Sequence, residues 1–186
     1  MIARVAFVAF PRMTLLDLVG AYDALRRAPG VQCEIVGTTT PVDDESGVRL
    51  VPASVYPDLA PFDLLVVPGG LGTRPLVDDE RCIEWLRGWG SERPIASVCT
   101  GALLLGRAGH LAGKRATTHH GAFDQLAPLC AQVVRDRRIV DEGRVVTAAG
   151  VSAALDLGLF LVERFFGAAE RLRIAAQMEY RHYSAD

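Results

Sequence analysis

The stretch Arg93-Pro-Ile-Ala-Ser-Val-Cys-Thr-Gly-Ala-Leu-Leu-Leu-Gly106 holds the clearest junction between a strand and a helix in this sequence. Residues 94–98 form an apolar run typical of a buried parallel strand, and residues 101–105 begin a helical pattern. Cys99 lies at the junction, and Gly101 permits the sharp bend that exposes a nucleophile. We expect the helix dipole and free N–H groups to lower the pKa of this thiol. The alternative is a buried structural cysteine, because free cysteines are often fully buried.

The rest of the chain alternates strand-like apolar runs with helical patterns. This alternation predicts an α/β fold with a mostly parallel sheet and helices on both faces, in a single domain over residues 1–186. Residues 41–61, rich in Asp, Gly and Pro, predict a small hairpin or an irregular excursion. Expected strands cover 4–10, 31–39, 63–67, 94–98, 114–118, 133–140 and 144–148; expected helices cover 15–28, 79–89, 121–130 and a stretch from 152 that breaks near 167.

Parallel α/β sheets bind their ligands at the carboxyl ends of the strands. The segments that follow the expected strands should therefore meet at one edge of the sheet, and each carries a group that a cysteine nucleophile can use. These segments are residues 11–17, 68–72, 99–100, 119–120 and 149–152.

Asp17 permits two interpretations. Thr14 and Asp17 have the spacing of a capping box at the start of a helix. Alternatively, Asp17 lies beside Cys99 and exchanges a proton with it, its pKa raised by burial and like charge so that it acts as a general acid near neutral pH. Gly69 and Gly70 directly follow a strand, and with the N–H of Thr100 their backbone N–H groups are candidates for an oxyanion-type hole. A simple turn is the alternative for the two glycines.

His119 and His120 follow another expected strand. Adjacent side chains of a strand point to opposite faces, so we expect only one of them near Cys99, as a base or a pocket wall. Their spacing is poor for zinc, and no metal site is predicted. The remaining cysteines, at positions 33, 82 and 130, are expected to be small core or near-surface residues, and the basic cluster at 135, 137 and 138 a solvated turn.

Composition excludes several classes of function. The chain has 186 residues, 50% of them hydrophobic, and a net charge of −2, so no basic surface favours a nucleic acid partner. Pro11 and Arg12 interrupt the apolar N-terminal run too early for a signal peptide, and no apolar stretch is long enough to span a membrane. Four scattered cysteines without a Cys-x-x-Cys pair fit a reducing cytoplasm.

Five segments together resemble the ThiJ/PfpI superfamily, relatives of the class I glutamine amidotransferase domain. They are Phe-Val-Ala-Phe-Pro-Arg-Met-Thr-Leu-Leu-Asp-Leu-Val-Gly (7–20), Asp-Leu-Leu-Val-Val-Pro-Gly-Gly (63–70), Ala-Ser-Val-Cys-Thr-Gly (96–101), Ala-Thr-Thr-His (116–119) and Val-Thr-Ala-Ala-Gly-Val-Ser-Ala-Ala-Leu-Asp (146–156). The resemblance implies a flavodoxin-like, doubly wound sheet with a nucleophile-elbow cysteine. Within the superfamily the chain is most similar to the isonitrile (isocyanide) hydratases and to the amidase-like domains of AraC-type regulators. Those regulators carry a C-terminal helix-turn-helix pair, for which a chain ending at Asp186 has no room, so a stand-alone enzyme is expected.

Two departures narrow the expected activity. Thr100 stands where members that resemble intracellular proteases have histidine. Asp17 stands where many members have glutamate, and the hydratases resemble this chain in having aspartate there. The resemblance therefore implies Cys99 as nucleophile, Asp17 as proton relay, and Thr100, Gly69, Gly70 and His119 around the substrate. It implies hydration of an isonitrile to a formamide by a homodimer acting on a small molecule, without metal or organic cofactor. A glyoxalase-type enzyme acting on 2-oxoaldehydes and a non-catalytic redox or ligand sensor are the alternatives.

Overall fold

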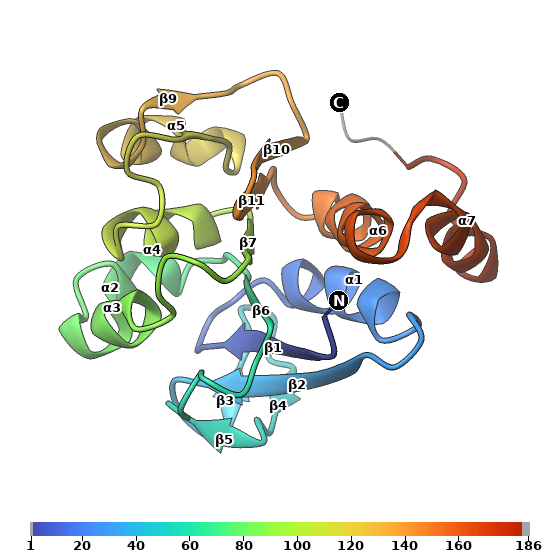
Figure 1. Ribbon diagram of the computed structural model, residues 1–186. Helices are drawn as coiled ribbons and strands as arrows, with labels where there is room; N and C mark the ends of the chain where they lie inside the picture. Colours follow the sequence, from blue (N-terminus) through green and yellow to red (C-terminus); the bar gives the residue numbers. More distant parts are fainter. Residues whose placement is uncertain (1, 184–186) are drawn as a thin grey trace.

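The computed structural model describes residues 2–183 and contains a seven-stranded sheet with helices on both faces (Figure 1). All neighbouring strands are parallel except the pair β10–β11 at one edge, which is antiparallel. The predicted α/β class with a mostly parallel sheet is thereby confirmed. In spatial order the strands are β10 (Ile139–Glu142), β11 (Val145–Ala148), β7 (Ile95–Val98), β6 (Leu64–Val67), β1 (Arg4–Ala9), β2 (Gln32–Gly37) and β5 (Ser54–Val55).

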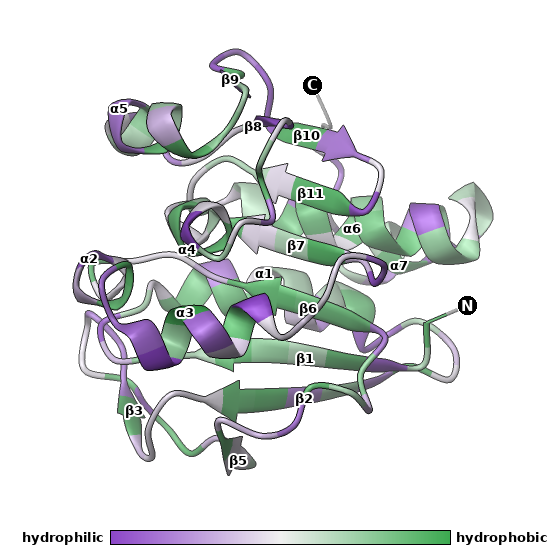
Figure 2. Cartoon of the chain, turned by 60° about the vertical axis from the view of Figure 1, so that its left-hand side comes forward, coloured by the Kyte–Doolittle hydropathy of each residue, from purple (hydrophilic) through white to green (hydrophobic). Residues whose placement is uncertain are grey.

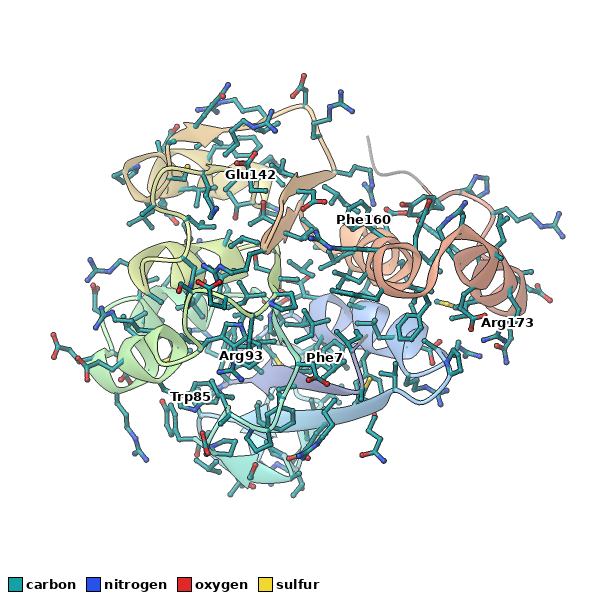
Figure 3. All side chains as sticks on the ribbon, in the orientation of Figure 1. Phe7, Trp85, Arg93, Glu142, Phe160 and Arg173 are labelled. Carbon is teal, nitrogen blue, oxygen red and sulfur yellow. The ribbon has the colours of Figure 1, made fainter. Side chains whose placement is uncertain are left out.

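The central strands are apolar because helices cover both of their faces. Every residue of β6 and β7 is buried, which explains why these segments form continuous apolar runs without alternation (Figure 2). Phe7 of β1 packs edge-to-face against Tyr22 of the helix Leu15–Leu25, with ring centroids 5.2 Å apart. Figure 3 shows Phe7 within the core and Trp85 on a helix of the opposite face.

Three helices cover one face of the sheet: α1 (Leu15–Leu25), α6 (Ala153–Phe166) and α7 (Ala168–Gln177). The other face is covered by α2 (Thr73–Leu76), α3 (Glu80–Arg87) and α4 (Gly101–Arg107), and α5 (Phe123–Leu126) packs on α4. Helices α1 and α6 approach closely at two glycines. A Cβ on Gly20 would lie 2.8 Å from Cβ of Ala154, and one on Gly158 would lie 2.9 Å from Cα of Ala21. This close packing places the start of α6 beside the start of α1.

Several predicted boundaries are corrected by the structure. The predicted strand 133–140 is instead two strands, β9 (Gln132–Val133) and β10, because the charged run 135–138 between them cannot be buried in a sheet. The predicted strand 114–118 shortens to β8 (Arg115–Ala116), which pairs with β9 in a separate two-stranded sheet. The predicted helix 121–130 is divided into η1 (His120–Ala122), α5 and η2 (Ala127–Leu129), where Pro128 interrupts regular helical bonding.

The predicted hairpin within residues 41–61 forms from β3 (Val42–Asp43) and β4 (Arg49–Leu50). Backbone hydrogen bonds attach it to the loop that precedes α1: the N–H of Arg12 donates to Asp43 O at 2.8 Å, and the N–H of Glu45 donates to Met13 O at 3.1 Å. The hairpin therefore lies against the carboxyl end of β1. Within residues 2–183, no helix combines the length and apolar character needed to cross a membrane.

Candidate active site

Cys99 occupies the turn between β7 and α4 with φ of 56°, a left-handed conformation that is unusual for a residue with a side chain. Hydrogen bonds hold its backbone there. The Cys99 N–H donates to Ala148 O and Ala149 O, both at 3.0 Å, and the Thr118 hydroxyl donates to Cys99 O at 2.7 Å. A Cβ on Gly101 would lie 2.3 Å from Val67 O, so only glycine permits this approach of α4 to β6. The predicted elbow is present in the structure.

Asp17 lies on the first turn of α1 and is 0% exposed. Its Oδ2 accepts a hydrogen bond from the Gly69 N–H at 3.0 Å, and its Oδ1 has no hydrogen-bond partner in the part of the chain that is described. The capping-box interpretation is wrong, because the Thr14 hydroxyl donates to Glu45 Oε1 at 2.9 Å and caps nothing. Asp17 thus faces the site, with one oxygen available for a reacting proton.

The environment of Asp17 favours its protonated form. Burial raises the pKa of Asp17 to about 7, and the nearby charge of Glu45 adds to this increase. Hydrogen bonds lower the pKa of Asp17 by less than burial raises it; they come from the Gly69 N–H, the Cys99 thiol and the backbone of Val151. The predicted direction is therefore confirmed, and Asp17 has the acidity of a group that exchanges protons near neutral pH.

The thiol of Cys99 does not have the lowered pKa that its position at a helix start predicts. Cys99 is 5% exposed, and burial raises its pKa to about 12, with the adjacent Asp17 as the second cause. The backbone N–H of Thr100 stabilises the thiolate, but less than burial and Asp17 destabilise it. A helix of seven residues cannot compensate for the lost hydration of a sulfur anion. Cys99 is therefore a neutral thiol at rest, beside the carboxyl group of Asp17.

Gly69 packs against Cys99 and Thr100, and Gly70 is bonded to Thr100, in an arrangement that differs from the predicted oxyanion hole. The Gly69 N–H is engaged with Asp17, and the Gly70 N–H donates to Thr100 Oγ1 at 2.9 Å. Neither glycine amide is a free donor, so this part of the prediction is wrong. A Cβ on Gly69 would lie 2.8 Å from Cβ of Cys99, which explains the need for glycine there. The two amides instead position Asp17 and Thr100.

His119 and His120 lie on the same side, contrary to the prediction from strand geometry. Strand β8 ends at Ala116, and His119 is the N-cap of η1, so the alternation of a strand does not apply. The two rings stack with centroids 4.2 Å apart, and Nδ1 of His119 accepts the Gly121 N–H at 3.1 Å. A Cβ on Gly150 would lie 2.4 Å from His119 Cδ2, so the His119 ring rests directly on the loop after β11. His119 lines a cavity together with residues of the loop after β11, such as Ala149 and Gly150.

The other cysteines lie away from this edge of the sheet. Cys33 is near the start of β2 and Cys82 is on α3; burial raises the pKa of each to about 12. Cys130 is half-buried after η2. Among the described residues, no three His, Cys, Asp or Glu side chains are arranged to hold a metal ion.

Two further groups that act on Asp17 have no recognisable signal in the sequence. The charge of Glu45 acts on Asp17 from the β3–β4 hairpin, in a region whose composition predicts a small hairpin or an irregular excursion but no functional group. Val151, with φ of 49°, presents its backbone to Asp17 from the loop before α6. Both depend on contacts between segments distant in sequence, for which local patterns carry no information.

A doubly wound sheet with a cysteine at its nucleophile elbow defines a flavodoxin-like α/β protein. The model of the DJ-1/PfpI family matches residues 3–164. This chain belongs to the DJ-1/PfpI family.

Individual relatives agree with this membership. The chain is 38% identical over 182 residues to a protein of Pseudomonas putida named isonitrile hydratase, covering 97% of this chain and 79% of that protein. It is 29% identical to the Parkinson disease protein 7 homolog of Danio rerio, covering 88% of each. Among solved structures, a ThiJ/PfpI family protein from Pseudomonas syringae superimposes with a TM-score of 0.89 at 30% identity, covering 99% of this chain and 77% of that chain.

Proposed function

We propose that this protein hydrates an isonitrile to an N-substituted formamide through a covalent intermediate on Cys99. One observation carries the proposal: the thiol of Cys99 lies beside a buried Asp17 whose pKa is near 7 and whose Oδ1 is unpaired in the described part of the chain. The similarity to the Pseudomonas putida hydratase supports the choice of substrate.

In the first step, the S–H bond of Cys99 adds across the terminal carbon of the isonitrile. Asp17 as carboxylate accepts the thiol proton while Sγ bonds to the carbon, and Asp17 as acid then delivers that proton to the same carbon. The product is a thioimidate, R–N=CH–S–Cys99. A thiol with a high pKa needs such an adjacent base, because it is not ionised at rest.

In the second step, water adds to the carbon–nitrogen double bond. Asp17 accepts a proton from the water as the water oxygen bonds to the carbon, and delivers that proton to the nitrogen, which gives R–NH–CH(OH)–S–Cys99. Asp17 then accepts the hydroxyl proton of this adduct as the C–S bond breaks and delivers it to the departing sulfur, which releases R–NH–CHO. Thr100, whose N–H and hydroxyl both favour the thiolate, stabilises sulfur as it departs.

The test is formanilide production from phenyl isonitrile by the purified protein and by three variants. We expect turnover by the wild type, none above background for Cys99→Ala, strong loss for Asp17→Asn, and normal turnover for the matched control Cys33→Ala. Turnover that survives Cys99→Ala would contradict the covalent route. Conversion of methylglyoxal in place of isonitrile would indicate a glyoxalase-type enzyme, and inactivity on both with ready oxidation of Cys99 by peroxide would indicate a sensor.

We further propose that the chain functions as a homodimer in the cytoplasm, where a reducing environment keeps its four cysteines free. Segments around the site expose apolar side chains that a second copy would cover: Leu16, Val19, Leu71 and Val151. Sedimentation at micromolar concentration is expected to show twice the mass of 20.1 kDa. A monomer under those conditions would contradict the proposal.

A further inference from the structure

His119 contacts the loop that joins β11 to α6, and this contact restricts one position of the loop to glycine. A Cβ on Gly150 would lie 2.4 Å from Cδ2 of His119, and the three atoms nearest to that Cβ all belong to the His119 side chain. Gly150 is not one of the glycines with a positive φ, so its backbone conformation is open to other residues. The imidazole ring, and not the backbone, therefore excludes a side chain at position 150.

The segment that carries His119 is itself anchored. Nδ1 of His119 accepts the N–H of Gly121 at 3.1 Å, which fixes the orientation of the imidazole. The N–H of Thr117 donates to a threonine hydroxyl of β11 at 2.9 Å, and the hydroxyl of Thr118 donates to Cys99 O at 2.7 Å. Because both of these threonines are buried, the ring of His119 has a fixed support behind it.

The loop on the other side of this contact touches both reactive residues. Ala149 O accepts the N–H of Cys99 at 3.0 Å, and the backbone of Val151 interacts with the carboxyl group of Asp17. Gly150 lies between these two contacts in the chain. A displacement of Gly150 would therefore move the backbone groups that face the thiol and the carboxyl group together.

Val151 needs such a support because its backbone is strained. Its φ of 49° is a left-handed conformation that is especially unfavourable for a β-branched residue, and it is exposed, so packing of its own side chain does little to hold it. Strained conformations persist only where the surrounding structure enforces them. The first turn of α6 contributes two hydrogen bonds, from the Ala153 N–H to Gly150 O at 3.2 Å and from the Ala154 N–H to Val151 O at 3.1 Å. The ring of His119 fills the space beside Gly150.

We propose that His119 is a positioning residue for the reactive pair: its ring holds Gly150 and thereby keeps the loop 149–151 against Cys99 and Asp17. This inference rests on the proposed function for the reaction that the pair performs, and on the contact between His119 and Gly150 for the role of the ring. It differs from the base or pocket wall that the sequence predicts, because the imidazole acts through the loop and not on the substrate.

The first test measures kcat and KM for hydration of phenyl isonitrile by His119→Ala. We expect a roughly tenfold lower kcat with KM within about twofold of the wild type, because a misplaced proton carrier slows the chemistry without removing a substrate contact. The matched control His120→Ala removes the stacked ring, leaves the contact with Gly150 and should keep both constants. A rise in KM alone for His119→Ala, or an equal loss of kcat in His120→Ala, would overturn the proposal.

A double-mutant cycle tests the contact itself. Gly150→Ala should lower kcat about tenfold in the wild-type background, because the new methyl group and the ring cannot occupy the same space. In the His119→Ala background the ring is absent, so the same substitution should lower kcat by less than about twofold. Equal losses from Gly150→Ala in the two backgrounds would show that the ring does not hold the loop, and would overturn the proposal.

Alkylation of Cys99 by iodoacetamide separates this inference from the proposed function, because it requires no isonitrile. The backbone of Val151 lowers the pKa of Asp17, so release of the loop should raise that pKa. We expect the pH dependence of alkylation to move higher by roughly 0.5 units in His119→Ala and in Gly150→Ala, the size of one weak backbone contact. The double variant should shift no further than either single variant.

The other groups that act on the carboxyl group of Asp17 are the same in all of these variants: the N–H of Gly69, the thiol of Cys99 and the charge of Glu45. A protein that hydrates no isonitrile but shows these shifts in alkylation would refute hydration and keep the positioning role of His119. Turnover by the wild type, together with an unshifted alkylation profile in His119→Ala, would do the reverse.

Discussion

Asp17 and Asp156 are both aspartates of 0% exposure, on the two helices α1 and α6 that pack against each other. Asp156 is bound by two nitrogens of Arg138 and by the hydroxyl of Tyr180. Asp17 accepts a hydrogen bond from the Gly69 N–H and interacts more weakly with the backbone of Val151, and no hydrogen bond to its Oδ1 is found among residues 2–183. The neighbours of Asp17 that affect its charge include an acid, Glu45, and a thiol.

The difference shows how partners, and not burial alone, decide what a buried carboxyl group does. A guanidinium and a hydroxyl consume the acceptor capacity of Asp156, so it stabilises the fold and joins α6 to the β9–β10 loop. A carboxyl without a cation is costly to ionise, so Asp17 retains its proton to near neutral pH and remains able to exchange it. The same residue type is structural in one place and reactive in the other.

The largest expected difference between Asp17 and Asp156 is in the rate of isonitrile hydration when each is replaced by asparagine. Asp17→Asn removes the proton acceptor and should lower kcat/KM for phenyl isonitrile by about a thousandfold, within the usual range for general acid–base groups. Asp156→Asn keeps hydrogen-bonding atoms in place and should change kcat/KM less than about threefold per folded molecule. Formamide production, normalised to folded protein, measures both. Similar losses in the two variants would remove the distinction between these residues.

The next effect concerns stability. Arg138→Ala leaves Asp156 buried without its cation, and should lower the free energy of unfolding by ~3 kcal/mol. The matched control Arg135→Ala removes an arginine from the same loop whose side chain is 59% exposed, and should change it by less than ~0.5 kcal/mol. Urea unfolding followed by circular dichroism makes the comparison. Equal stability of the two variants would show that the Asp156 pair is not structural.

Asp17→Asn should stabilise the protein in a manner that depends on pH. The pKa of Asp17 is raised by burial from 3.8 to about 7, so the folded state binds a proton that the unfolded state has lost. The stability of the wild type therefore falls as pH rises from 4 to 7, and the variant lacks this loss. Its advantage should grow by ~2.5 kcal/mol between pH 5 and pH 8. An advantage that is constant over this range would place the pKa of Asp17 outside it.

The smallest expected effect is a shift in the pH dependence of kcat/KM when the charge of Glu45 is removed. The wild-type kcat/KM should rise with pH through an apparent pKa of about 7, because the reactive pair must lose its first proton. Glu45→Gln removes a repulsive charge and should move this rise to lower pH by roughly 0.3 units. Glu84→Gln on the exposed side of α3 serves as control and should leave the profile unchanged. A shift toward higher pH in Glu45→Gln would contradict the assigned interaction.

Local patterns in the sequence suffice to predict the layered fold and the set of loops that meet at the site. Apolar runs such as 64–67 indicate buried parallel strands, and parallel strands bring their carboxyl ends to one edge. Asp17, Gly69, Cys99, His119 and Gly150 therefore meet there, as five separate segments predicted. Periodicity and chain direction are local properties, so a linear sequence contains them.

The protonation states and hydrogen bonds of these groups depend instead on how the chain packs in three dimensions. The pKa of Cys99 is raised, not lowered, because burial and Asp17 outweigh the start of a short helix. The Gly69 amide donates to a carboxylate 52 residues away, and the stacked histidines share one cavity with arginines that follow a different strand. Protonation and hydrogen bonding depend on hydration and on distances of a few ångströms, and these are set when segments far apart in the chain pack together.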